Sequence, residues 1–98
     1  MANYATNIFF ASTENESDLN RIETFLDEKF ETCFLERNDG CIDAEFDSRW
    51  EFPEKLMDEL VASLEDRDNI YIRVLTHELP NEYVSFRIFR DGEWDIRY

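Results

Sequence analysis

Acidic residues alternate with apolar ones in one short stretch of this chain, at a spacing that suits charge recognition. Asp43, Glu45 and Asp47 occupy every second position, and Glu36 lies just upstream. In a β-strand this spacing puts the three carboxylates on one face, about 6.8 Å apart, as a regular row of negative charge. Such a row can imitate a phosphate backbone and pair with the Lys and Arg side chains that line a nucleic-acid-binding groove.

The same carboxylates are candidates for acid–base or cation chemistry, but the rest of the sequence lacks the partners for it. The only histidine, His77, precedes Glu78 at a predicted strand end, without the other ligands that a zinc site needs. The chain contains no Gly-rich phosphate loop, no EF-hand spacing and no nucleophile motif. We therefore expect a protein that is not an enzyme and that holds no metal or cofactor.

Composition favours a single folded domain that spans residues 1–98. Of the 98 residues, 43% are apolar and 15% aromatic, so the chain can bury enough surface to offset the entropy of ordering. The formal net charge of −14 repels a phosphate backbone and argues against direct nucleic-acid binding. Since no apolar run is long enough for a membrane span or a signal peptide, we expect a cytoplasmic protein.

The negative charge is concentrated in the middle of the chain. Residues 14–66 hold eighteen acids and five bases, whereas residues 67–98 hold six acids and five bases, and residues 1–13 carry no charged side chain. A surface that is acidic only for solubility would spread this excess more evenly. The distribution predicts that one part of the folded surface has a strong negative field.

The predicted order of elements is β-α-β-β-α-β followed by a C-terminal β-hairpin. The first helix is expected to have its N-cap at Ser17 or Asp18, and the second to run from Pro53 to about residue 65. This order predicts an α+β fold, a ferredoxin-like two-layer sandwich in which two helices cover one face of a mostly antiparallel sheet. Strands are expected at residues 4–11, 32–37, 41–49, 70–77, 83–90 and 94–98.

The predicted hairpin around Asp39-Gly40 sets the neighbours of the acidic row. A two-residue turn there pairs Leu35 with Ala44 and Cys33 with Phe46 on the apolar face. The opposite face then carries the pairs Thr32–Asp47, Phe34–Glu45 and Glu36–Asp43. Like charges directly opposite one another in a sheet are destabilising. We therefore expect that a role other than stabilising the fold accounts for these like-charge pairs.

The strand pattern also leads to predictions for Phe34, for the two cysteines and for the last hairpin. Phe34 should point away from the helices, either as the apolar anchor of an interface or beneath a loop, the C-terminal hairpin or a second subunit. Cys33 and Cys41 should be too far apart for a disulfide, as suits a reducing compartment. The last hairpin has two possible registers, one pairing Phe89 with Trp94 and one pairing Ile88 with Ile96.

Two short motifs give the chain a resemblance to a known family. Asn3–Asn7 keeps the two asparagines of an Asn-Trp-Cys-x-Asn signature, with Tyr for Trp and Ala for Cys. Phe46–Pro53 matches Phe-x-Thr-x-Trp-x-Pro-Pro, with Ser for Thr and Phe for one Pro. On these motifs the chain resembles the YubB-like ferredoxin-like family of small phage and plasmid proteins. The resemblance implies a βαββαβ-type fold and a mobile-element origin, and it brings no established catalytic residues.

Together these observations predict a non-enzymatic acidic interaction module. Its expected partner is the basic surface of a nucleic-acid-handling protein, and the resemblance makes it a phage inhibitor of the DNA-mimic or anti-CRISPR type. The alternatives are a merely solubilising acidic surface and a homo-oligomeric accessory protein, in which the exposed sheet face or the last strand pairs with a second copy. The predicted contact residues are Phe34, Glu36, Asp43, Glu45 and Asp47, with Asp27 and Glu31 flanking them.

Overall fold

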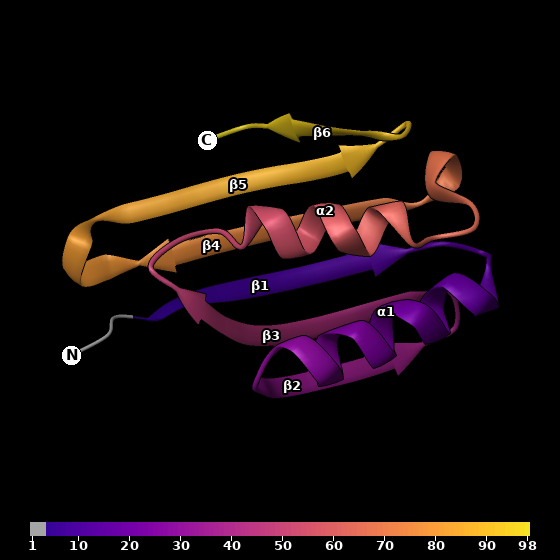
Figure 1. The fold of residues 1–98 in the computed structure, drawn as a ribbon, viewed down its shortest axis with the longest axis horizontal. Helices are drawn as coiled ribbons and strands as arrows, with labels where there is room; N and C mark the ends of the chain where they lie inside the picture. Colours follow the sequence, from indigo (N-terminus) through magenta and orange to yellow (C-terminus); the bar gives the residue numbers. More distant parts are fainter. Residues whose placement is uncertain (1–3) are drawn as a thin grey trace.

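The computed structural model describes residues 4–98, except for the side chains of Thr32 and Cys33. Figure 1 shows the predicted order β-α-β-β-α-β, followed by a C-terminal hairpin. In chain order the elements are β1 (Tyr4–Ser12), α1 (Glu16–Lys29), β2 (Thr32–Asn38), β3 (Cys41–Arg49), α2 (Glu54–Ala62), β4 (Tyr71–Glu78), β5 (Tyr83–Arg90) and β6 (Glu93–Ile96), with short 3₁₀ turns at Arg67–Asn69 and Leu79–Asn81.

The strands form one open antiparallel sheet in the order β2-β3-β1-β4-β5-β6. Both helices lie on the same side of it (Figure 1), so the predicted α+β class with two helices on one face is confirmed. The six-stranded order differs from that of a standard four-stranded ferredoxin-like sheet, because β5 and β6 continue the sheet beyond β4. None of the described helices is long and apolar enough to cross a membrane.

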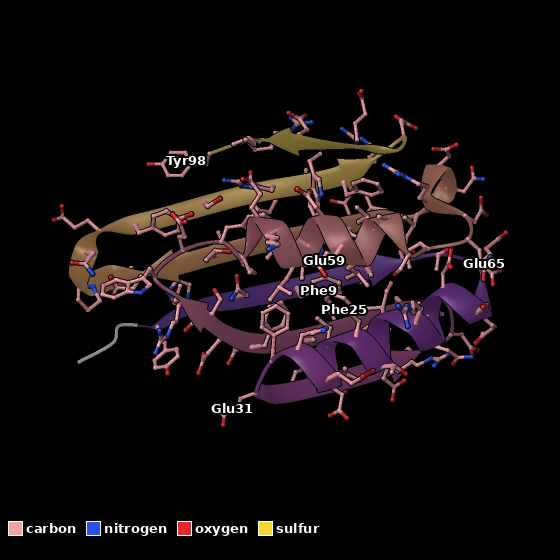
Figure 2. All side chains as sticks on the ribbon, in the orientation of Figure 1. Phe9, Phe25, Glu31, Glu59, Glu65 and Tyr98 are labelled. Carbon is pink, nitrogen blue, oxygen red and sulfur yellow. The ribbon has the colours of Figure 1, made fainter. Side chains whose placement is uncertain are left out.

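Alternating burial along the strands determines which face the helices cover. On β1, Asn7, Phe9 and Ala11 are buried, while Ile8 between them is 45% exposed. Phe9 of β1 and Phe25 of α1, both labelled in Figure 2, belong to the buried apolar core that joins the sheet to the helices. Because burial alternates with a period of two, the residues between the buried ones lie on the other face of the sheet, which no described helix covers.

The start of α1 differs from the prediction. Its N-cap is Asn15, whose side chain accepts a hydrogen bond from the backbone N–H of Asp18 at 2.9 Å. Asp18 is instead buried, and its carboxylate accepts hydrogen bonds from the backbone N–H groups of Glu65 and Asp66 at 2.8 and 2.9 Å. Asp18 thus joins the beginning of α1 to the segment after α2, a long-range contact that local capping preferences do not reveal.

The β2–β3 hairpin keeps the predicted register next to its turn and loses it at the far end. The pairs Leu35–Ala44, Phe34–Glu45 and Glu36–Asp43 are confirmed. A shift between Thr32 and Phe34 pairs Thr32 with Phe46, so the predicted pairs Cys33–Phe46 and Thr32–Asp47 are wrong. The cause is an irregularity of the β-bulge kind, in which an extra residue on one strand displaces the pairing beyond it.

The first sequence motif and the cysteine pair lie only partly within the described residues. Asn3 of the first motif lies outside the described residues. Cys41 is a free, partly buried thiol. The side chain of Cys33 is outside the description, and the predicted separation of the two thiols stays a prediction.

The C-terminal half settles the register that the sequence left open. Asp91 and Gly92 both have positive φ, 55° and 78°, and form a two-residue turn that pairs Phe89 with Trp94. Trp94 packs at ring-centroid distances of 5.2 Å from Phe89 and 5.7 Å from Phe52. Packing on the helix side therefore selects this register. The second helix ends earlier than predicted, at Ala62.

Candidate functional site

The sheet face that points away from the helices is uncovered by any described element, and we call it the open face. Its residues follow from the strand registers, which align Phe34, Glu45, Ile8, Leu75 and Phe86 in one row across five strands. Two regions of this face differ in chemistry. The acidic flank, on β2 and β3, consists of Glu36, Asp43, Glu45 and Asp47, and the apolar centre, on β1, β4 and β5, consists of Ile8, Phe10, Leu75, Val84, Phe86 and Ile88.

The acidic flank brings together the four carboxylates that the sequence predicts. Asp43, Glu45 and Asp47 take successive same-face positions on β3, about 6.8 Å apart in an antiparallel strand. Glu36 on β2 lies directly opposite Asp43, as in a like-charge cross-strand pair. Glu36 and Glu45 are exposed, and Asp43 and Asp47 are partly buried.

No Lys or Arg forms an ion pair with the acidic flank within the described part of the chain, although Arg49 follows Asp47 at the next same-face position of β3. The ion pairs found there join Arg37 to Glu16 and Glu23, Arg87 to Glu54, and Arg97 to Asp95. Asn38 donates a hydrogen bond to Glu36 at 3.3 Å. The flank carboxylates are therefore available to cations from outside the chain.

The arginine nearest in sequence to the flank points to the other side of the sheet. Arg37 of β2 donates to Glu23 at 3.1 Å and to Glu16 at 2.6 Å, both on α1. The hydrogen bond with Glu23, followed by the bond and the charge of Glu16, raises the pKa of the Arg37 guanidinium above its usual value. Arg37 thus forms ion pairs with two acidic residues of α1. Its neighbour Glu36, on the open face, has no ion pair within the described chain.

Phe34 lies on the open face beside the acidic flank. It is 51% exposed and pairs with Glu45 across the hairpin. The C-terminal hairpin is at the opposite edge of the sheet, because four strands lie between β2 and β6, and it does not cover Phe34. An exposed aromatic ring beside carboxylates has the composition of an interface anchor with a charged rim.

The two predicted flanking residues lie elsewhere. Asp27 is exposed on α1, in the helix layer behind the sheet, so it does not extend the row on the open face. Glu31 follows α1, at the outer end of this helix in Figure 2. It lines a cleft of about 820 Å³ with Asp47 and with the cations Lys29, Arg49 and Lys55, so the charge there is mixed.

Sequence reasoning missed the apolar centre. Ile8 aligns with Leu75 and Phe86, and in the next row Phe10 aligns with Arg73 and Ile88. The signal was the unbroken run Ile8, Phe9, Phe10, which puts apolar side chains on both faces of β1 and departs from the polar–apolar alternation of a half-solvated strand.

Metal and acid–base chemistry gain no geometric support. The described residues contain no cluster of three or more His, Cys, Asp or Glu side chains suited to a metal ion. His77 aligns with Thr6 and Val84 on the open face, and no ion pair to a carboxylate joins it within the described chain.

Comparisons with protein-family models, curated proteins and solved structures found no match for this chain. The resemblance to the YubB-like family therefore stays a prediction.

Proposed function

We propose that this protein is a non-enzymatic interaction module whose acidic flank binds the basic surface of a nucleic-acid-handling protein. It acts as an inhibitor of the DNA-mimic or anti-CRISPR type carried by a mobile element, in the cytoplasm of a bacterial host. The observation that carries the proposal is the row of four carboxylates that form no ion pair within the described chain, on an uncovered sheet face.

The energetics of the flank support a role in binding. The opposed pair Glu36–Asp43 is destabilising by an amount in the range of about 0.2–1 kcal/mol typical of cross-strand pairs. Carboxylates of a merely solubilising surface need no such arrangement, since the exposed helix positions already carry acids. A cationic partner relieves the repulsion and is attracted by the long-range field of a chain with a net charge of −14.

The partner class follows from the pattern of charge. A groove that binds nucleic acid is lined by Lys and Arg at the spacing of successive phosphates, and it gains affinity by neutralising them. Asp43, Glu45 and Asp47 offer a comparable linear series of anions on a rigid strand. Phe34 supplies apolar contact at the edge of this series.

The proposal also includes the family resemblance of the fold and a location in the cytoplasm. The first four strands, in the order β2-β3-β1-β4 with α1 after β1 and α2 after β3, support a ferredoxin-like unit within the larger six-stranded sheet. This arrangement supports the resemblance to the YubB-like family. The free thiol of Cys41 is compatible with a reducing cytoplasm.

The test is a pull-down from bacterial host extract with the wild-type protein and two variants that lose the same charge. The flank variant carries Glu36→Gln, Asp43→Asn, Glu45→Gln and Asp47→Asn. The control variant carries Glu28→Gln, Asp58→Asn, Glu59→Gln and Glu65→Gln, all at exposed positions on or next to the helices and away from the open face. We expect the wild type and the control to recover one nucleic-acid-handling protein, which duplex DNA then displaces, and the flank variant to lose it.

Three outcomes contradict the proposal. The flank variant, folded by circular dichroism, recovers the same partner as well as the wild type; the control loses the partner equally, which would leave only net charge; or the wild type recovers nothing but copies of itself. The last outcome supports a homo-oligomeric accessory protein, the alternative that the uncovered apolar centre favours.

A further inference from the structure

We infer that the segment that binds the open face is an amphipathic α-helix of the partner, with Lys or Arg along one border of its apolar stripe. This inference rests on the proposed function and specifies the shape of the partner surface. It uses the apolar centre, which the proposed function by itself leaves unexplained.

The acidic flank and the apolar centre are parts of one continuous surface. One row runs from Glu45 of β3 through Ile8 and Leu75 to Phe86 of β5. The neighbouring row begins at Asp43 and continues with Phe10. Each row therefore passes from a carboxylate to apolar side chains within one strand spacing of about 4.8 Å. A partner that contacts the carboxylates of β3 lies directly beside the apolar centre.

The apolar centre presents partly exposed apolar side chains from three adjacent strands. Ile8 is 45% exposed and Val84 39% exposed, and the other members of the centre are partly exposed or half-buried. The Arg73 guanidinium lies 4.2 Å from the centroid of the Phe10 ring, so it stacks on the centre and extends its flat surface. Contiguous apolar patches of this kind mark interaction sites in soluble proteins.

The dimensions of the centre fit a helix. Three neighbouring strands, β1, β4 and β5, span roughly 10–15 Å at about 4.8 Å per strand, and a helix with its side chains is about 10–12 Å in diameter. The nine-residue strand β1 is about 30 Å long, as is a helix of about 20 residues. A helix laid along the strands therefore covers the centre over its whole length.

The charge spacing fits the same helix. Residues four apart on a helix are separated by about 6 Å along its axis, and the carboxylates of Asp43, Glu45 and Asp47 recur at about 6.8 Å. The mismatch over three positions is within the reach of flexible Lys and Arg side chains. Three cations, four residues apart and bordering the apolar stripe, can thus pair with β3 while the stripe packs on the centre.

The other classes of occupant fit this face less well. Nucleic acid is repelled by the flank and by the net charge of −14. Two copies of the chain placed face to face must bring two such charges together. A basic surface without an apolar stripe leaves the centre exposed to water.

The test uses two synthetic peptides of identical composition and the full-length protein. The first peptide is an amphipathic helix of Leu, Ala and Lys with Lys at every fourth position beside a Leu stripe, and the second has the same residues in scrambled order. Binding is measured by isothermal titration calorimetry, and its location by backbone NMR shifts. We expect the helical peptide to bind at least about tenfold more tightly than the scrambled one. The NMR shifts that it causes in the protein should concentrate on β1, β3, β4 and β5.

Variants of the protein separate this inference from the proposed function. Against the helical peptide, the flank variant and a centre variant with Ile8→Thr and Leu75→Thr should each lose about tenfold or more in affinity, while the control variant is unchanged. Equal binding of both peptides by the wild type, lost only in the flank variant, overturns the helix and leaves the basic-surface function intact. Unchanged binding by the flank variant overturns the function as well.

A further outcome is independent of whether the centre variant folds. Sedimentation of the wild type as a dimer that excludes both peptides identifies the occupant as a second copy and overturns the inference. Sedimentation as a monomer that binds the helical peptide supports it.

Discussion

Acidic side chains on the two sides of the sheet have opposite surroundings. On the helix side, Glu16 and Glu23 pair with Arg37, and the buried carboxylate of Asp18 accepts two backbone N–H groups. On the open face, Glu36 and Asp43 oppose each other without a cation within the described chain. The first group therefore contributes to folding, and the second reduces stability and is available to a partner.

Apolar residues show the same division. Phe9 is buried against the helices, whereas its neighbours Ile8 and Phe10 face the open side. The two faces of one strand thus carry the core and the proposed binding surface. Substitutions on the two faces should consequently differ in their effect on the free energy of unfolding.

The largest effect is expected in the core under the helices. Phe46 is fully buried, with ring centroids 4.3 Å from Phe30 and 5.9 Å from Phe9. Phe46→Ala should lower the free energy of unfolding by about 3–5 kcal/mol, since it removes a buried ring and leaves a cavity. Urea denaturation followed by circular dichroism measures this value. A loss below about 1 kcal/mol would contradict the assignment of Phe46 to the core.

A smaller loss is expected for the buried acid on the helix side. Asp18→Ala leaves the backbone N–H groups of Glu65 and Asp66 without their acceptor, and should lower the free energy of unfolding by about 2–3 kcal/mol. The same denaturation experiment measures it. Glu45→Ala on the open face is the matched control, with a change within about 0.5 kcal/mol. Equal losses for the two variants would remove the distinction between the two groups of acids.

Neutralising the acidic flank should change stability in the opposite direction. The flank variant should gain about 0.2–1 kcal/mol in the free energy of unfolding at low salt, because the Glu36–Asp43 repulsion is removed. The gain should shrink near 1 M salt, where the screening length is about 3 Å. Denaturation at both salt concentrations tests this, with the control variant of equal charge beside it. A loss of stability would mean that the fold uses these carboxylates.

The smallest effect is expected at the exposed ring. Phe34→Ala should change the free energy of unfolding by less than about 0.5 kcal/mol, since the side chain is 51% exposed. The affinity of the Phe34→Ala variant for a basic partner should nevertheless fall, because Phe34 is the proposed apolar anchor of the interface. Comparison of denaturation with the pull-down described above separates the two effects. Marked destabilisation with unchanged binding would assign Phe34 to the fold instead.

Local patterns were sufficient for the part of the site next to its turn. The Asp39-Gly40 turn and the alternation of Asp43, Glu45 and Asp47 predicted the pairs Phe34–Glu45 and Glu36–Asp43. Turn geometry and a period of two act over a few residues, so they are legible in sequence. The irregularity at Thr32 was not predictable, because no residue type there marks it.

Long-range contacts explain the remaining differences. Asp18 was predicted as a cap because its residue type favours that position, yet its partners are Glu65 and Asp66, far along the chain. The register of the last hairpin depends on Trp94 packing against Phe52 and Phe89. Asp27 was expected near the row because it is close in sequence, but it belongs to α1, which lies on the side of the sheet opposite the open face.

Sequence alone was enough to establish the acidic excess, the α+β order of elements and the alternation that lines up the carboxylates, since composition and short-range periodicity are properties of neighbouring residues. The absence of an ion pair to those carboxylates within the described chain depended on the tertiary fold. So did the apolar centre next to them, because strands distant in the chain had first to be assembled into one sheet with both helices on the same side.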